Sequence, residues 1–137
     1  MASVVDSIAQ YVATDLSLGT LGSTVFEDSM PDAADGSIDT CIAVYNVPGA
    51  APDLTQGDNT DRPSFMVVCR SLSADTALAN DLAIYDALHG LTETSVHGTY
   101  FLLIAAVQSA PTPLGRDEKA RLMWARNFRA IVRGVTR

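Results

Sequence analysis

The stretch from Asp61 to Gly90 constrains the fold more than any other part of this sequence. It opens with Asp61-Arg62-Pro63 and continues into Phe65-Met66-Val67-Val68-Cys69, which is apolar on both faces at the two-residue period of a strand. Proline has no N–H to give to a neighbouring strand, so Pro63 belongs at the start or edge of this strand. The sequence therefore predicts a strand that begins near Pro63, lies centrally in a sheet and is covered on both sides.

An amphipathic helix follows this strand almost at once. Ser73 can cap its first turn, and Gly90 can end it. Between them, apolar residues recur at steps of three and four, namely Ala74, Ala77, Leu78, Leu82, Tyr85 and Leu88. Because so short a turn joins strand and helix, the helix must fold back and cover one face of the sheet.

The rest of the chain supplies further strands and one more helix. A capping box at Ser3-Val4-Val5-Asp6 predicts a helix that runs to about Thr14 or Leu16. Period and turn residues predict strands near 24–26, 38–47, 92–96 and 100–108, with a turn at His97-Gly98. The segment 122–133 alternates as a strand does, although a helical pattern through Leu122, Ala125, Phe128 and Val132 fits nearly as well.

These elements predict one α+β domain over residues 1–137. It has an antiparallel or mixed β-sheet with two helices packed on one face, in the order α-β-β-β-α-β-β-β. The expected main core consists of Phe65, Val67, Leu78, Leu82, Tyr85, Tyr100, Leu102, Trp124 and Phe128.

Composition favours a soluble subunit that associates. With 137 residues the chain can bury a core without disulfides or metals, and a hydrophobic share of 47% beside only 18% charged residues leaves neutral surface for contacts. The first residues lack a signal peptide's basic region, and no apolar run is long enough to span a membrane, so an intracellular protein is expected. Cys41 and Cys69 lie in apolar runs and are expected to be buried thiols.

The formal net charge of −7 conceals an uneven distribution. Seven of the nine basic residues and only two acids lie after residue 115, so this end has a net charge of +5, while residues 1–115 have a net charge of −12. Either the basic segment neutralises acids within one fold, or the two charged regions dock between copies or onto a partner. In the docking hypothesis, the basic segment forms an edge of the sheet.

Two segments are too long and polar for simple turns. Residues 48–62 and 109–120 are rich in proline and polar side chains, and we expect exposed loops that make contacts with neighbours or partners. Pro111 and Pro113 are expected to end strand pairing in the second of them. The run Asp58-Asn59-Thr60-Asp61 begins like a calcium loop but lacks the glycine and distal glutamate, so no metal site is expected.

No motif for catalysis or cofactor binding is present in the sequence, so neither a catalytic nor a cofactor-binding residue is expected. His89 precedes the helix-ending glycine and His97 lies in a turn, and both have ordinary structural explanations. Asp81 falls within the apolar stripe, where a bond to backbone or to an arginine is the simplest explanation. An acidic chain with Trp124 among arginines does not favour a nucleic-acid surface.

Several short motifs follow one another along the sequence, in the order Asp61-Arg62-Pro63, the run from Ile84 to Gly90, Gln108-Ser109, Leu114-Gly115-Arg116-Asp117-Glu118 and Asn127-Phe128. Together they resemble a family of tailed-bacteriophage neck proteins described as minor capsid or tail terminator proteins. The resemblance covers nearly the whole chain and departs at Lys119-Ala120-Arg121, where the family tends to have a small turn with Asn or Gly.

The resemblance implies a structural virion protein rather than an enzyme. Such subunits form a ring, commonly a hexamer, at the head-proximal end of the tail tube. The implied partners are other copies, the tail tube protein and a head-tail connector or stopper protein. The resemblance allows DNA to pass through the ring, and it implies neither a membrane nor sequence-specific nucleic acid as a partner. The protein would then be found at the tail-head junction of the virion, and in the host cytoplasm during assembly.

Charge polarity adds a hypothesis about the contact between subunits. The expected interface residues are Asp53, Asp58, Asp61, Arg116, Arg121, Arg126 and Arg129. The alternative function is a small α+β enzyme or ligand-binding domain whose site is built from loops.

Overall fold

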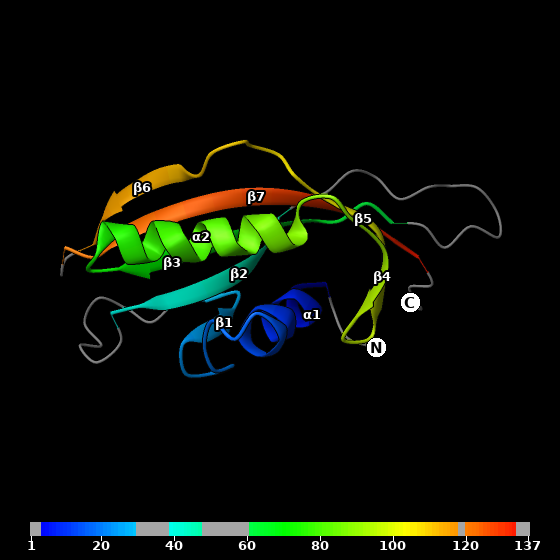
Figure 1. The fold of residues 1–137 in the computed structure, drawn as a ribbon, viewed down its shortest axis with the longest axis horizontal. Coiled ribbons are helices and arrows are strands. Elements are labelled where there is room, and N and C mark those ends of the chain that lie inside the picture. The colour runs from blue at the N-terminus through cyan, green and yellow to red at the C-terminus, as the bar shows by residue number, and fades with distance from the viewer. Residues whose placement is uncertain (1–3, 30–38, 48–60, 118–119, 134–137) are drawn as a thin grey trace.

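The computed structural model describes residues 4–29, 39–47, 61–117 and 120–133. Two helical segments lie on one face of a seven-stranded mixed sheet (Figure 1). The helices are α1 (Val4–Gln10), continued by the π-helix η1 (Tyr11–Asp15), and α2 (Ala74–Leu88). The strands are β1 (Val25–Glu27), β2 (Cys41–Val47), β3 (Ser64–Ser71), β4 (Leu91–Val96), β5 (Thr99–Ala106), β6 (Thr112–Arg116) and β7 (Leu122–Arg133). The α+β class and the predicted order of elements are confirmed, with β6 added.

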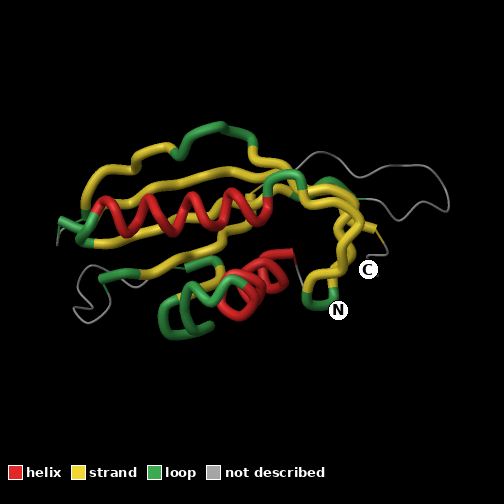
Figure 2. Tube along the Cα trace, viewed as in Figure 1, coloured by secondary structure: helices red, strands yellow, loops and turns green. Residues whose placement is uncertain are grey.

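The final segment is a strand, and it lies in the middle of the sheet. The strand order is β1-β2-β3-β7-β5-β4, and β6 also pairs with β7. On one side, β7 pairs with β3, and the two strands run side by side as long yellow tubes in Figure 2. Their register runs from Ser64 opposite Arg129 to Ser71 opposite Leu122. On its other side, β5 pairs with the C-terminal half of β7 and β6 with the N-terminal half. The expectation that this segment forms a sheet edge is therefore wrong, because both of its sides are occupied.

Strand β6 lies within a segment that was expected to be a loop. Its five residues are all exposed, and it pairs antiparallel with β7 although Pro113 lies opposite Trp124. A proline is tolerated here because β6 has a partner on one side only and its register shifts between Pro113 and Gly115. The expectation that the prolines end pairing is wrong for Pro113, which pairs within β6, whereas Pro111 lies between β5 and β6, outside both strands. The expected exposure of residues 112–116 is confirmed.

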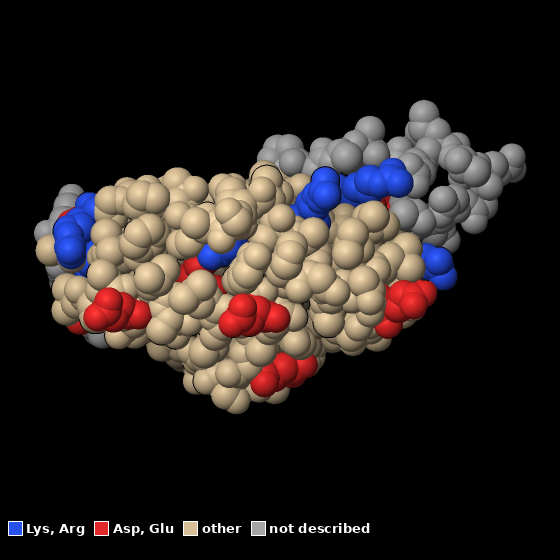
Figure 3. Space-filling model, turned by 45° about the horizontal axis from the view of Figure 1, so that its top comes forward, with Lys and Arg blue, Asp and Glu red and all other residues tan. Residues whose placement is uncertain are grey.

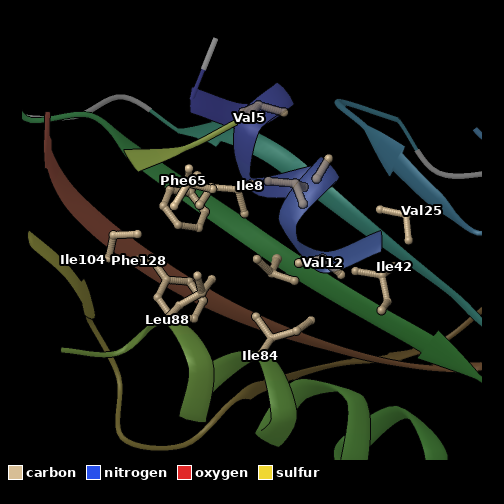
Figure 4. Packing of buried hydrophobic residues seen from close by; sticks show 14 of the residues in the cluster. Val5, Ile8, Val12, Val25, Ile42, Phe65, Ile84, Leu88, Ile104 and Phe128 are labelled. Carbon is tan, nitrogen blue, oxygen red and sulfur yellow. The ribbon is translucent and has the colours of Figure 1, made fainter. Parts of the chain in front are cut away.

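The core lies between the sheet and the two helices. Side chains at alternate positions of β3 and β7, among them Phe65 and Phe128, point toward the helices (Figure 4). The rings of these two phenylalanines stack with centroids 5.2 Å apart. Helix α1 contributes Val5, Ile8 and Ala9 to the same cluster, and η1 contributes Val12. Of the expected core residues, Phe65, Val67 and Phe128 are confirmed as fully buried.

Helix α2 is rotated about its own axis from the orientation that its apolar stripe predicts, so a different side of the helix faces the sheet. Its buried positions are Ala77, Asp81, Ile84 and Leu88. Leu82 is 46% exposed, so its expected place in the core is wrong. The other expected core residues, Leu78, Tyr85, Tyr100, Leu102 and Trp124, are only half-buried. The rotation follows from the partner of Asp81, described below.

Both ends of α2 agree with the sequence signals. The Ser73 hydroxyl accepts a hydrogen bond from the Thr76 N–H at 3.4 Å. Gly90 has φ +85, a left-handed conformation that glycine adopts without the steric cost of a side chain. Its N–H donates to the Ile104 carbonyl at 2.8 Å, which ties the end of the helix to β5.

Candidate functional site

The charged residues divide into those used inside the subunit and those left on its surface. Asp81 and Arg126 belong to the first group, since both are at most 2% exposed. Arg126 Nη2 donates to Asp81 Oδ2 at 2.7 Å, and Nε donates to Oδ1 at 3.2 Å. This two-bond geometry is the strong form of an arginine–carboxylate pair, and it joins α2 to β7 through the core. The simplest explanation for Asp81, a bond to an arginine, is confirmed.

Neighbouring groups complete the environment of the Arg126 guanidinium. Its carbon lies 4.2 Å from the centroid of the Tyr85 ring, and its Nη1 donates to the Gln108 carbonyl at 3.1 Å. The Tyr85 ring stacks on His89, whose Nδ1 accepts from the Ala106 N–H at 3.0 Å. This cluster connects α2 to the end of β5 and explains His89 as a structural residue.

A second set of buried charges lies where β6 leads into β7. Arg121 is fully buried, and its Nε donates to Asp117 Oδ2 at 2.8 Å. Its Nη1 lies 3.7 Å from Asp39 Oδ1, and the buried Arg70 lies 3.9 Å from Asp117 Oδ2. Arg121 and Arg126 are thus neutralised inside the fold, as the first hypothesis for the basic segment proposes.

The other proposed interface residues have different surroundings. Arg116 is exposed and donates to the Ala120 carbonyl at 2.8 Å. Asp61 exchanges two backbone hydrogen bonds with Val132, at 3.0 and 2.9 Å, and is half-buried. Arg129 is exposed. Asp53 and Asp58 lie outside the described residues, as does most of the predicted loop 48–62.

A hollow lies on the face of the sheet opposite the helices. Phe128, Ala130 and Val132 belong to the core, so the alternating Arg129, Ile131 and Arg133 point to the other face. The hollow has a volume of about 340 Å³ and is lined by Arg62, Ser64, Leu103, Arg129, Ala130 and Ile131. We call it, together with the adjacent exposed Arg133, the arginine hollow. The described residues that line it include two arginines and no acid.

The outer surface of α2 has the opposite charge. Asp75, Ala79, Leu82 and Asp86 are all exposed and recur at steps of four, three and four. At 100° per residue they lie on the side of the helix opposite its buried residues. We call these four residues the α2 stripe. Figure 3 shows the face that carries α2 as mostly uncharged surface with separate acidic spots, while most basic side chains lie toward its two ends.

The sequence interpretation missed the α2 stripe because it assigned Leu82 to the core. The signal was present in the spacing of Asp75 and Asp86, eleven residues or three helical turns apart, which places them on one side of the helix. Arg133 was grouped with the basic segment, but the hollow beside it depends on Leu103 of a different strand, which spacing alone does not reveal.

The described residues contain no group of three or more His, Cys, Asp or Glu side chains able to hold a metal ion. In the same part of the chain, every helix is too short or too polar to cross a membrane.

Comparison with known proteins gives a family and a fold. The family described as "Bacteriophage tail terminator protein" matches residues 14–133. No curated protein sequence matches the chain.

Two solved structures share the fold. One is a chain from the "Virion of native gene transfer agent (GTA) particle", with 20% identity and a TM-score of 0.57, over 97% of this chain and 87% of that one. A second solved chain has 16% identity and a TM-score of 0.50, over 83% of this chain and 82% of its own length. At these identities the likeness concerns the fold, whereas the family match extends over most of the sequence, so the chain belongs to the bacteriophage tail terminator family.

Proposed function

We propose that this protein is the tail terminator subunit of a tailed phage and that it acts as a structural part of the virion. Copies close into a ring, most simply a hexamer, at the head-proximal end of the tail tube. One face of the ring stops growth of the tube, and the other receives the head connector or stopper protein. Assembly takes place in the host cytoplasm, and the finished ring stays in the neck of the virion.

The observation that carries this proposal is the family match over residues 14–133. The structure agrees with a structural role, because its buried charged side chains are engaged in packing the subunit. Asp81 and Arg126 join a helix to the sheet, and Arg121 with Asp117 closes the turn before β7.

The decisive experiment measures assembly with and without the tail tube protein. Native mass spectrometry of the purified protein should give a closed oligomer, and negative-stain microscopy should show a ring. Added to polymerising tube protein, the subunit should cap tubes at one end and limit their length. A protein that stays monomeric and leaves tube growth unchanged would contradict the proposal.

The alternative, a ligand-binding domain, has one observation in its favour. The arginine hollow, with Arg62 and Arg129 on its wall, has the charge to receive a small anion, and its volume of about 340 Å³ is at the small end of ligand sites. A monomer that binds phosphate or a dicarboxylate by calorimetry, with loss of binding in Arg129→Ala, would favour that function over a ring.

A further inference from the structure

The proposed ring requires two different surfaces on each subunit that fit each other. In a closed ring every subunit meets its neighbours through a heterologous contact, in which one patch docks on another. We propose that the α2 stripe of one subunit docks into the arginine hollow of the next. This inference rests on the proposed function, since it assigns the contact between copies of this chain.

The charges of the two surfaces are complementary and available. Asp75 and Asp86 are exposed and make no ion pair or side-chain hydrogen bond within the described part of the subunit, and the same holds for Arg129 and Arg133. At the rim of an interface such charges stay partly hydrated when they pair, so the loss of hydration is small and complementary charges set the orientation of docking more than its strength. A contact between the two surfaces brings two acids to two arginines.

Apolar groups lie between the charges on both surfaces. Leu82 lies between Asp75 and Asp86, is 46% exposed and is one of the five large hydrophobic side chains exposed in the described residues. On the other surface, Ile131 lies between Arg129 and Arg133 and pairs with Leu103 across the strands. Leu82 therefore has an apolar site to enter, and its burial would supply the larger part of the binding free energy.

The dimensions of the two surfaces agree. The eleven residue steps from Asp75 to Asp86 span roughly 17 Å of helix. The four residue steps from Arg129 to Arg133 span roughly 14 Å of strand. The long arginine side chains easily cover the difference, so both ion pairs can form while Leu82 contacts Ile131.

The placement of the two surfaces suits a ring and not a closed dimer. The α2 stripe lies on the helix side of the sheet and the arginine hollow on the other side, so a docked pair always leaves one free surface of each kind. Contacts of this kind continue from subunit to subunit until rotation closes the ring. In this arrangement the neighbouring subunit covers the face of the sheet that carries the arginine hollow, which no helix among the described residues covers.

The test reverses the charges on one surface at a time. The acid-reversed variant has Asp75→Arg and Asp86→Arg, and the arginine-reversed variant has Arg129→Asp and Arg133→Asp. All four positions are exposed, so each variant should fold, as circular dichroism and urea unfolding will check. Sedimentation should show self-association weakened by about tenfold or more in either variant alone.

Mixing the two variants makes the test specific. In an alternating assembly each reversed α2 stripe meets a reversed hollow and each unchanged stripe meets an unchanged hollow, so an equimolar mixture should recover the oligomer of the parent. As a matched control, Glu93→Arg makes the same change of charge as Asp86→Arg at an exposed site on β4. It should leave association unchanged.

A covalent trap gives a second readout. Leu82→Cys combined with Leu103→Cys should give disulfide-linked chains upon oxidation, up to the size of the ring, whereas each single variant should give none beyond dimers. If the parent is monomeric, the ring itself is refuted. If the parent forms a ring but the reversed variants assemble as well as the parent, or the mixture recovers nothing, the ring stands and this contact is refuted.

Discussion

Arg126 and Asp81, 45 residues apart in the chain, form a buried two-bond ion pair between the middle of β7 and the inward face of α2. Each alone would be an uncompensated charge in a core of apolar side chains. Together, with Tyr85 over the guanidinium and the Gln108 carbonyl at its edge, they satisfy most of each other's hydrogen-bonding capacity. The pair therefore fixes which side of α2 faces the sheet.

Removing one partner of this pair should strongly destabilise the subunit. Asp81→Ala or Arg126→Ala leaves a charge buried without its partner, which costs about 3–5 kcal/mol. The free energy of unfolding, measured by urea titration, should fall by that amount in each single variant.

A double variant measures how much the ion pair contributes to stability relative to apolar side chains at the same two positions. Asp81→Leu with Arg126→Met replaces both charges by apolar groups and should recover much of the loss, because buried ion pairs often contribute little relative to well-packed hydrophobic residues. Arg129→Ala, three residues further along β7 and exposed, should change stability by no more than about 0.5 kcal/mol. A double variant as unstable as the two single losses combined would show that the two side chains stabilise the subunit independently, through contacts other than their ion pair.

Truncation to alanine should destabilise the subunit very differently at two apolar residues of α2. Ile84 is 1% exposed in the core, and Ile84→Ala should cost about 2–5 kcal/mol. Leu82 is 46% exposed, so Leu82→Ala should lower the free energy of unfolding by no more than about 1 kcal/mol. If urea titration shows an equal decrease in the free energy of unfolding for the two variants, Leu82 is part of the core after all.

The contrast between Ile84 and Leu82 shows where sequence interpretation stops. Spacing predicted the helix, its Ser73 cap and its Gly90 end, all of which depend on nearby residues. The buried side could not be predicted by counting apolar residues, because Asp81 turns inward to meet an arginine 45 residues away. A long-range pair of charges here overrides the local apolar pattern.

The arrangement of the sheet shows the same limit. The apolar runs predicted β2, β3 and β5 as strands, since each carries its own signal, whereas the pattern of residues 122–133 fitted a helix nearly as well as the strand β7. Their neighbours depend on contacts between distant segments, so the insertion of β7 between β3 and β5 was not predicted. Strand β6 was missed because proline is a strong local signal against pairing, while an edge position beside β7 permits it.

Glu27 should make the stability of the subunit depend on pH. Burial raises its pKa above the ordinary value of 4.5, and the neighbouring Asp6 carboxylate raises it further. Between that value and the raised pKa, the folded state binds more protons than the unfolded state, so the free energy of unfolding falls as the pH rises through this window.

The variant Glu27→Gln removes this dependence. Relative to the parent it should become progressively more stable as the pH rises from 4.5 toward 7, which urea unfolding at several pH values will measure. Glu93→Gln, an exposed site on β4, makes the same change of charge and serves as the control. If the free energy of unfolding differs between the parent and Glu27→Gln by the same amount at every pH in this range, a raised pKa of Glu27 is contradicted.

Both cysteines should be unreactive in the folded subunit. Cys41 and Cys69 are at most 1% exposed. Burial raises the pKa of the Cys69 thiol far above its ordinary value, with a smaller contribution from Asp81, and burial also raises the pKa of Cys41. Because the thiolate is the reactive form, a thiol reagent should modify neither residue in buffer and both in concentrated urea. Rapid modification of one thiol in buffer would show that its covering segment opens.

Arg126 and Arg129 lie three residues apart on β7 but on opposite faces of the sheet, so reversing their charges should have different consequences. Arg126→Glu places a carboxylate beside Asp81 in the core, and the subunit should unfold or aggregate. Arg129→Glu should fold like the parent, with an unchanged unfolding midpoint, but associate less.

The loss in Arg129→Glu should depend on ionic strength. Its difference from the parent should be largest at low salt and should shrink as salt approaches about 1 M, where the Debye length is only about 3 Å. Association that persists at high salt would then come from apolar contact, and Leu82→Ala should weaken it at every salt concentration. Sedimentation of parent, Arg129→Glu and Leu82→Ala over a salt series will separate the two contributions. A salt dependence that is the same in Arg129→Glu and in the parent would mean that this arginine takes no part in contacts between subunits.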